Sequence, residues 1–389
     1  MSIAPESLGG MKPEMRERRI LILTVPHGAS HDRAAGALKK ALAEAQPDLT
    51  VRVENALDRC ARWFRFYYDS YKIPLKYWPG LWEWVEGLQH RSNSTGPAWL
   101  YRQGGKKLFR FIEEFDPDVV VATEVGLCEL AALLKRERGA RFRLVAMPTE
   151  SNFDQAWAQP EVDLYTVSPD GAQAQLKAAG VFTEKILACG MPVDPAFESL
   201  PDRAAARARL GARGDTPLVL VLFGGSGTAK PHPILTELEK IRLPLQVVLI
   251  AGKNRRLEEG LAHFVAASRG SPKFRAFGWV DNIHEWMAAA DLLVSKPGAT
   301  TVIEAINAAL PILAFDPLPG NELRTCAQIE EWGVGTWVKR RQGLGATIER
   351  LCANRGEVQR MRDCTLALAR PSAAKDAARA VLKLLDQRG

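Results

Sequence analysis

A polar segment at residues 295–304 carries groups that suit a nucleotide diphosphate. The segment follows an apolar run, turns at Gly298, and enters a helix at Thr300 or Thr301. N–H groups at a helix N-terminus bind phosphate oxygens. Glu304 follows about one helical turn later, and its carboxylate accepts hydrogen bonds, so it suits both hydroxyls of a ribose. The alternative is a plain strand-to-helix connection that binds no ligand.

Two further loops follow apolar runs in the same half of the chain. The glycine-rich loop at residues 225–227 comes directly after the run 218–223, and its backbone N–H groups could hold phosphate. It lacks the Gly-Lys-Ser/Thr ending of a nucleoside-triphosphate P-loop. Asn321 and Glu322 follow the run 312–315. We expect these two side chains to face the same cleft and to contact sugar hydroxyls.

A histidine follows the first apolar run of the chain. The run 20–25 leads into small residues and then His31, and a helix is predicted from Arg33. This spacing directs His31 toward the mouth of a cleft, where an imidazole could deprotonate an acceptor hydroxyl. The equally favoured alternative is a turn histidine that caps the helix.

The sequence offers no pattern typical of a metal or disulfide site. Asp116-Pro-Asp118 resembles a metal-binding Asp-x-Asp motif, but it precedes an apolar run instead of ending one, and it predicts a helix-to-strand turn. The six cysteines form no Cys-x-x-Cys pair and indicate reduced thiols in a cytoplasmic protein. The first apolar run is too short for a signal sequence or a spanning helix, so we expect a soluble or peripheral protein.

Short apolar runs alternate with helical stretches along the whole chain, which predicts parallel sheets built from βαβ units. Strands are expected at 20–25, 51–53, 119–123, 143–147, 164–167 and 185–188, and again at 218–223, 246–250, 274–277, 292–295, 312–315 and 336–338. Prolines crowd the stretch 192–201, the best linker candidate. We predict an N-terminal domain over 1–196, a C-terminal domain over 197–370 and a final helix within 371–389. Ligands of such sheets bind at the carboxyl ends of the strands.

The predicted N-terminal domain contains a basic and aromatic insertion, residues 59–111. It has ten Lys and Arg against three Asp and Glu, an excess equal to the net charge of +7 of the whole chain, and five of the ten tryptophans. Aromatic rings favour the bilayer interface and basic side chains attract anionic lipids. Ordinary core aromatics and single-stranded nucleic acid are the alternatives, but no nucleic-acid motif accompanies the segment. The candidate membrane residues are Arg62, Arg65, Lys72, Lys76, Trp78, Trp82 and Trp84.

These motifs resemble those of monogalactosyldiacylglycerol synthases and processive diacylglycerol glucosyltransferases, which are related to the peptidoglycan lipid-intermediate GlcNAc transferase. The resemblance covers roughly residues 20–338 and is carried by the segments 24–35, 162–165, 190–195, 296–304 and 319–322. Ser30 stands where the family has glycine, and the run 150–154 lacks the family's histidine.

The resemblance implies a GT-B fold, with two Rossmann-like domains that face each other across a cleft. It implies an inverting transfer of a hexose from a UDP-sugar to a lipid, with diacylglycerol as the expected acceptor, by a peripheral membrane protein without an essential metal or other cofactor. His31 matches the proposed base, and residues 277–280 match the main chain that meets uracil. The implied donor-site residues are Gly225, Ser226, Gly227, Val280, Gly298, Ala299, Thr300, Glu304, Asn321 and Glu322.

Two other functions remain open from the sequence. A UDP-sugar epimerase with the same architecture would need further acid and base groups at the sugar. A scaffold that binds a donor and a membrane without catalysis would not need both His31 and Glu304. The sequence does not distinguish glucose from galactose, which differ in the orientation of one hydroxyl.

Overall fold

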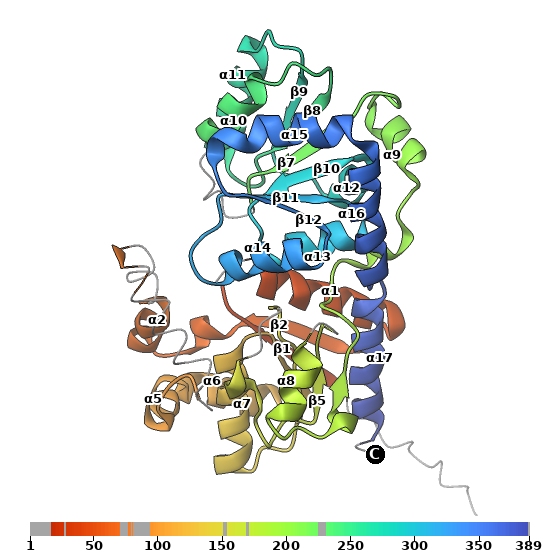
Figure 1. Ribbon diagram of the computed structural model, residues 1–389. Coiled ribbons are helices and arrows are strands. Elements are labelled where there is room, and N and C mark those ends of the chain that lie inside the picture. The colour runs from red at the N-terminus through yellow and green to blue at the C-terminus, as the bar shows by residue number, and fades with distance from the viewer. Residues whose placement is uncertain are drawn as a thin grey trace, which may run out of the picture.

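Two α/β domains are stacked one on the other (Figure 1). The computed structural model describes residues 17–26, 29–70, 77–78, 80, 94–150, 154–168, 171–224 and 231–387. Each domain has a six-stranded sheet in which every pairing is parallel, with strand orders β2-β1-β3-β4-β5-β6 and β12-β11-β10-β7-β8-β9. This arrangement is the predicted GT-B fold.

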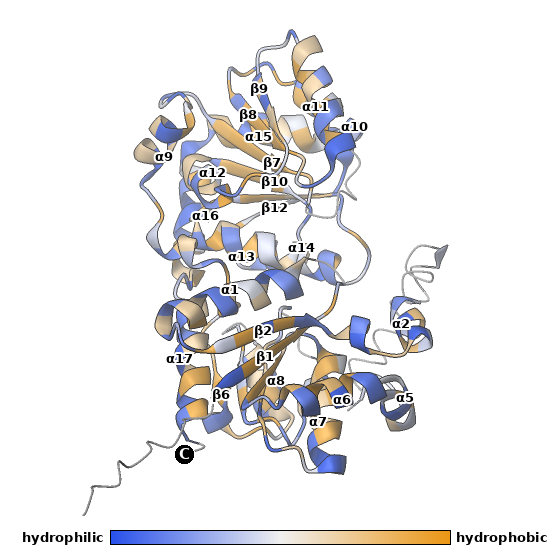
Figure 2. Ribbon diagram, turned by 180° about the vertical axis from the view of Figure 1, so that it is seen from behind, coloured by the Kyte–Doolittle hydropathy of each residue, from blue (hydrophilic) through white to orange (hydrophobic). Residues whose placement is uncertain are grey.

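The N-terminal sheet is built from long apolar runs because helices cover both of its faces. Residues 20–23 of β1, which lies between β2 and β3, are fully buried. Figure 2 shows hydrophobic residues concentrated on such strands. The strands are β1 (Arg19–Thr24), β2 (Thr50–Asn55), β3 (Val119–Ala122), β4 (Arg143–Ala146), β5 (Leu164–Thr166) and β6 (Ile186–Leu187). The described helices are α1 (Ser30–Ala45), α2 (Arg62–Asp69), α5 (Ala98–Gly104), α6 (Lys106–Phe115), α7 (Val125–Arg138) and α8 (Ala172–Ala178).

The C-terminal sheet repeats this plan. Its strands are β7 (Leu218–Leu222), β8 (Gln246–Ile250), β9 (Lys273–Phe277), β10 (Leu292–Ser295), β11 (Ile312–Phe315) and β12 (Gly335–Val338). Its helices are α9 (Arg203–Leu210), α10 (Pro231–Glu239), α11 (Arg255–Ala267), α12 (Ile283–Ala289), α13 (Ala299–Asn307), α14 (Asn321–Glu331), α15 (Leu344–Ala353) and α16 (Arg355–Leu368).

The chain crosses between the domains twice. The proline-rich stretch makes the first crossing, and its residues Met191, Val193 and Phe197 pack in the core of the C-terminal domain. The predicted boundary after residue 196 falls within this stretch. The second crossing leads into α17 (Ala373–Asp386), which packs against α1 and lies along the N-terminal domain (Figure 1). The final helix therefore ties the two domains together.

All twelve predicted strands are present, with ends displaced by at most two residues. The start of α1 was predicted wrongly, because the helix begins at Ser30 and includes His31 in its first turn. Asp32 supplies a negative charge at this N-terminus and accepts a hydrogen bond from the Thr24 hydroxyl at 2.8 Å, which favours the earlier start.

The other structural expectations concern turns, thiols and membrane spans. Asp116 ends α6 in a left-handed conformation just before β3, as expected of a helix-to-strand turn. The six cysteines are free thiols. Within the described ranges, no helix has both the length and the apolar character that a bilayer crossing requires.

Candidate active site

A cavity of about 430 Å³ lies between the two domains. Helix α1 and the proline-rich stretch line one side of it, and the ends of β7 and β8, the loop after β9 and the first turns of α12 and α13 line the other. Three of the predicted donor-site residues line it, namely Val280, Thr300 and Glu304. The cavity therefore lies at the carboxyl ends of the C-terminal strands, where parallel sheets bind their ligands.

Glu304 is a buried carboxylate with one unused oxygen. Its side chain is 2 % exposed, and Oε1 forms an ion pair with Arg33 of α1, across the cleft. Oε2 is buried without a hydrogen-bond partner, as is the Thr300 hydroxyl. Burial raises the pKa of Glu304 to about 7, although the Arg33 guanidinium opposes this shift. Buried polar atoms without partners are rare in native proteins, and these two belong to residues that line a cavity, where a ligand could bind them.

The N-terminus of α13 adds further donors to this cavity. Gly298 is its N-cap residue and has no side chain that could accept from the first-turn N–H groups. Thr300 and Thr301, in that turn, line the cavity. These N–H groups and the helix dipole favour an anion next to Glu304.

His31 lies in the first turn of α1, the helix that lines one side of this cavity, but its buried side chain lines neither this cavity nor the smaller one beside Thr149. Its Nδ1 is 2.8 Å from the carbonyl oxygen of Thr123 and 3.0 Å from the hydroxyl of Thr149. Because a carbonyl only accepts, Nδ1 carries the proton and Nε2 retains its lone pair. Burial lowers the pKa of His31. The ring is therefore neutral near pH 7, and Nε2 can accept a proton.

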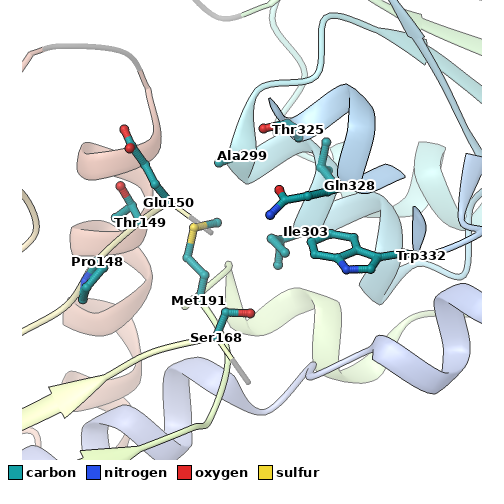
Figure 3. A pocket seen from close by; sticks show the side chains of 11 residues that line it. Pro148, Thr149, Glu150, Ser168, Met191, Ala299, Ile303, Thr325, Gln328 and Trp332 are labelled. Carbon is teal, nitrogen blue, oxygen red and sulfur yellow. The ribbon is translucent and has the colours of Figure 1, made fainter. Parts of the chain in front are cut away.

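A second, smaller cavity lies between residues 148–150, which include the His31 partner Thr149, and the helices α13 and α14 of the C-terminal domain. Figure 3 shows Thr149 and Glu150 on one side, Ile303, Gln328 and Trp332 on the other, and Met191 between them. The predicted site residue Ala299 also lines this cavity, not the larger one. The two cavities thus flank the first turns of α13.

The other predicted donor-site residues at α14 are engaged with protein groups. The side-chain amide of Asn321 donates to Glu150 Oε2 at 2.7 Å, and this bond joins the two domains. The Glu322 carboxylate accepts the backbone N–H of Leu318 at 2.6 Å, which stabilises the turn before α14. Neither residue lines the larger cavity.

Several predicted residues lie outside the described ranges. They include Gly225, Ser226 and Gly227 of the glycine-rich loop and the membrane candidates Lys72, Lys76, Trp82 and Trp84. Gly224, the last described residue before this loop, lines the larger cavity and has a φ of 82°. That left-handed conformation favours glycine at the point where the loop leaves β7.

The described part of the basic and aromatic insertion has an outer face and an inner face. Trp63, Phe66 and Tyr67 of α2 and Trp99 of α5 are 46 %, 69 %, 40 % and 60 % exposed, and we call them the α2–α5 surface. Arg62 and Arg65 lie on the same helix, and Trp78 is also exposed. The α2 and α5 helices project from one side of the N-terminal domain (Figure 1).

The inner face of α2 packs in the core of the N-terminal domain. The interpretation as ordinary core aromatics is therefore correct for the side chains on this face. Phe64 is fully buried, and its ring centroid lies 5.4 Å from that of Tyr68 and 5.8 Å from that of Tyr101. The Tyr68 hydroxyl donates to Glu124 Oε2 at 2.9 Å. Glu124 directly follows Thr123, whose carbonyl oxygen is hydrogen-bonded to His31 Nδ1. Packing and this hydrogen bond fix α2 relative to the cleft.

Sequence reasoning missed three residues that contact the predicted ones, two of them across the cleft. Arg33, Thr149 and Glu150 were not among the predicted site residues, yet each contacts a predicted one. One signal was present, because an arginine in the first turn of a helix opposes the helix dipole and so suggests a partner elsewhere. The partners themselves depend on how the domains face each other.

Comparisons with known proteins agree with this architecture. Residues 31–193 match the family model of monogalactosyldiacylglycerol synthase, and residues 219–323 match that of the glycosyltransferase family 28 C-terminal domain. A processive diacylglycerol beta-glucosyltransferase of Bacillus mycoides is 23% identical over 366 residues, which cover 92% of each chain. The protein of that name from Bacillus subtilis is 24% identical over 262 residues, covering 67% of this chain and 68% of the relative.

Solved structures show the same fold at low sequence identity. Acinetobacter baumannii MurG matches with a TM-score of 0.63 and 14% identity, over 94% of this chain and 99% of that one. Staphylococcus aureus MnaA, in a structure with UDP, matches with a TM-score of 0.60 and 13% identity, over 95% and 97%. The chain therefore has the GT-B fold and joins a region that matches the monogalactosyldiacylglycerol synthase model to a region that matches the glycosyltransferase family 28 C-terminal model.

Proposed function

We propose that this glycosyltransferase moves a hexose from a UDP-sugar to diacylglycerol at a membrane surface, with inversion at the anomeric carbon. The observation that carries the proposal is the interdomain cavity with two unpartnered buried groups, Glu304 Oε2 and the Thr300 hydroxyl, across from helix α1, whose first turn contains a neutral histidine. The names of the diacylglycerol glucosyltransferase relatives support the lipid acceptor.

The donor occupies the C-terminal side of the cleft in this proposal. The ionised Glu304 carboxylate accepts hydrogen bonds from both ribose hydroxyls, which uses the oxygen that is unpartnered in the empty site. The diphosphate lies at the N-terminus of α13, where the Thr300 hydroxyl and first-turn N–H groups donate to it. The main chain near Val280 contacts uracil. These fixed donors take over the role of a divalent metal.

The transfer is a single displacement. Nε2 of His31 takes the proton of the acceptor hydroxyl as its oxygen bonds to the anomeric carbon. The bond from this carbon to the phosphate oxygen breaks, and UDP leaves with the electron pair. The Nδ1–H bond to Thr123 holds the reactive tautomer and stabilises the imidazolium that forms. The donors of α13 stabilise the negative charge on the leaving diphosphate.

The lipid acceptor reaches the cleft from the bilayer in this proposal. The α2–α5 surface presents large aromatic side chains to solvent next to Arg62 and Arg65. Aromatics at the interface and cations at anionic headgroups are two separate attractions, and stable peripheral binding generally needs two. The inner face of α2 connects this surface to the His31 side of the cleft through Tyr68 and Glu124.

One assay tests the function against its alternatives. The protein is incubated with UDP-glucose or UDP-galactose and with anionic liposomes that contain diacylglycerol, with and without a chelator. We expect equal amounts of UDP and new glycolipid, with no effect of the chelator. Conversion of the sugar nucleotide without lipid would show an epimerase. Nucleotide binding without any turnover would show a scaffold, and either result would overturn the proposal.

A further inference from the structure

Arg33 is placed where it does not serve its own helix. It lies in the first turn of α1, where a positive charge opposes the helix dipole. Arg33 belongs to the N-terminal domain, but its guanidinium forms an ion pair with Glu304 of the C-terminal domain. Its side chain is 38 % exposed, whereas the Glu304 side chain is 2 % exposed, so the arginine comes from the open side of the cavity.

This ion pair occupies part of the carboxylate that the proposed donor needs. Arg33 holds Glu304 Oε1 and leaves Oε2 without a partner. A ribose that places one hydroxyl on each carboxylate oxygen therefore displaces the guanidinium from Oε1. Displacement leaves a cation at the mouth of a cavity that also contains Thr300 and Thr301 of the α13 N-terminus.

A diphosphate at that helix would be the next partner for the displaced cation. Among the described residues that line the cavity, Arg33 is the only arginine or lysine. A guanidinium has a planar fork of N–H groups that fits two phosphate oxygens, and such charge-assisted pairs are about twice as strong as neutral hydrogen bonds. Uridine offers no such partner, because it has the ribose without the phosphates.

We propose that Arg33 is a donor-binding residue supplied by the acceptor domain. It pairs with Glu304 while the site is empty and moves to the diphosphate when the UDP-sugar binds, so that donor binding draws α1 and His31 toward the anomeric carbon. This inference rests on the proposed donor site at Glu304 and adds a residue and a sequence of events to it.

The two nucleotides should respond to Arg33→Ala in opposite directions. UDP loses the charge-assisted contacts, so its affinity should fall about 10- to 100-fold. Uridine no longer has to displace a guanidinium from Glu304, so its affinity should rise about 2- to 5-fold. Calorimetric titrations of the wild type, Arg33→Ala and Arg33→Lys with UDP and with uridine measure both. The matched control is Lys39→Ala, which removes an exposed cation from the same helix.

Each outcome of these titrations has a distinct meaning. Opposite changes for the two nucleotides, with Lys39→Ala unchanged and Arg33→Lys intermediate for UDP, support the proposal. Tighter binding of both nucleotides would mean that Arg33 only blocks the site, and weaker binding of both would mean that it only maintains the structure of the site. Either result overturns the proposal. If the wild type binds neither nucleotide, the proposed donor site itself is wrong.

Discussion

Two buried glutamates, one in each domain, differ in how their oxygens are used. Glu304 of α13 has one oxygen paired with a partly exposed arginine and one oxygen with no partner. Both oxygens of Glu129 in α7 accept hydrogen bonds from the backbone N–H of Thr95, at 3.1 and 3.0 Å. Hydroxyls of Ser94, Thr95 and Tyr101 also donate to Glu129.

Burial raises the pKa of both carboxyls, so the pKa alone does not separate a ligand site from a structural clamp. The hydrogen-bond partners of the two carboxylates do separate the two kinds of site. Glu129 is saturated by groups of its own domain and holds the segment before α5 against α7. Glu304 retains an oxygen for a group that the protein does not provide. Unused polar atoms in a cleft therefore indicate function better than perturbed ionisation does.

The largest effect is expected at His31, which resembles Glu304 in that the proposal gives it a direct contact with a substrate. His31→Ala should reduce turnover about 10²- to 10⁴-fold, the usual contribution of a general base, and leave the affinity for UDP unchanged. Steady-state kinetics and UDP titration measure the two quantities, with the exposed His263→Ala as control. Near-normal turnover would make His31 a structural residue and would break its analogy with Glu304.

A stability gain is expected at Glu304, because a ligand site is not optimised for the empty protein. Its pKa rises from an ordinary 4.5 to about 7. Between these values the unfolded chain loses the proton while the folded protein keeps it, so the free energy of unfolding falls as pH increases through this window. Glu304→Gln should therefore raise that free energy by about 2–3 kcal/mol at pH 8 and change it little at pH 4. Denaturant unfolding at both pH values would contradict this if Glu304→Gln were destabilising at pH 8.

The opposite sign is expected at Glu129. Glu129→Ala leaves the Thr95 N–H and the Tyr101 hydroxyl without their acceptor, which should lower the free energy of unfolding by about 1–3 kcal/mol. The exposed Glu113→Ala, in a surface ion pair with Arg138, should change it by about 0.5 kcal/mol or less. Urea unfolding at pH 8 compares the three glutamates directly. If the free energy of unfolding of Glu129→Ala were unchanged, the structural role assigned to Glu129 would be wrong.

The smallest effect is expected at the α2–α5 surface, where attraction is spread over several side chains. Arg62→Gln should weaken binding to anionic liposomes by about 1 kcal/mol, or roughly fivefold, at 0.1 M salt. The difference should vanish at 1 M salt because the Debye length falls from about 10 Å to about 3 Å. Liposome sedimentation is the measurement.

A paired change separates the aromatic attraction from the charge. Phe66→Ser should weaken the binding that remains at high salt, whereas Phe182→Ser, equally exposed on another part of the domain, should not. Equal binding of the wild type to neutral and anionic liposomes would refute the electrostatic part. Absence of binding to both would remove the membrane role of this surface.

The sequence was sufficient for the fold because parallel strands buried on both faces are continuous apolar runs. Residues 20–23 and 292–294 are examples, since each run is fully buried in a central strand. The sequence was not sufficient to predict where helix α1 begins. The start of α1 depends on the bond between Thr24 and Asp32, and no side-chain cap at Ala29 marks it.

The candidate site was predictable only where the signal was local. Thr300 and Glu304 belong to one strand, turn and helix, and the structure brings both to the interdomain cavity. Arg33 and Glu150 act across the cleft, so their contacts depend on the relative placement of two domains that no local pattern encodes. Asn321 was expected to contact a sugar, but its side-chain amide donates to Glu150 in the structure.

The most direct test of the central claim is a calorimetric titration of UDP into three proteins: the wild type, Glu304→Ala and Glu129→Ala. Two charge-assisted hydrogen bonds to ribose are lost in Glu304→Ala, so its affinity should fall by at least about 100-fold. The affinity of Glu129→Ala should stay within about twofold of the wild type, since Glu129 is saturated by its own domain. Unchanged UDP affinity in Glu304→Ala would contradict the assignment of this cavity as the donor site.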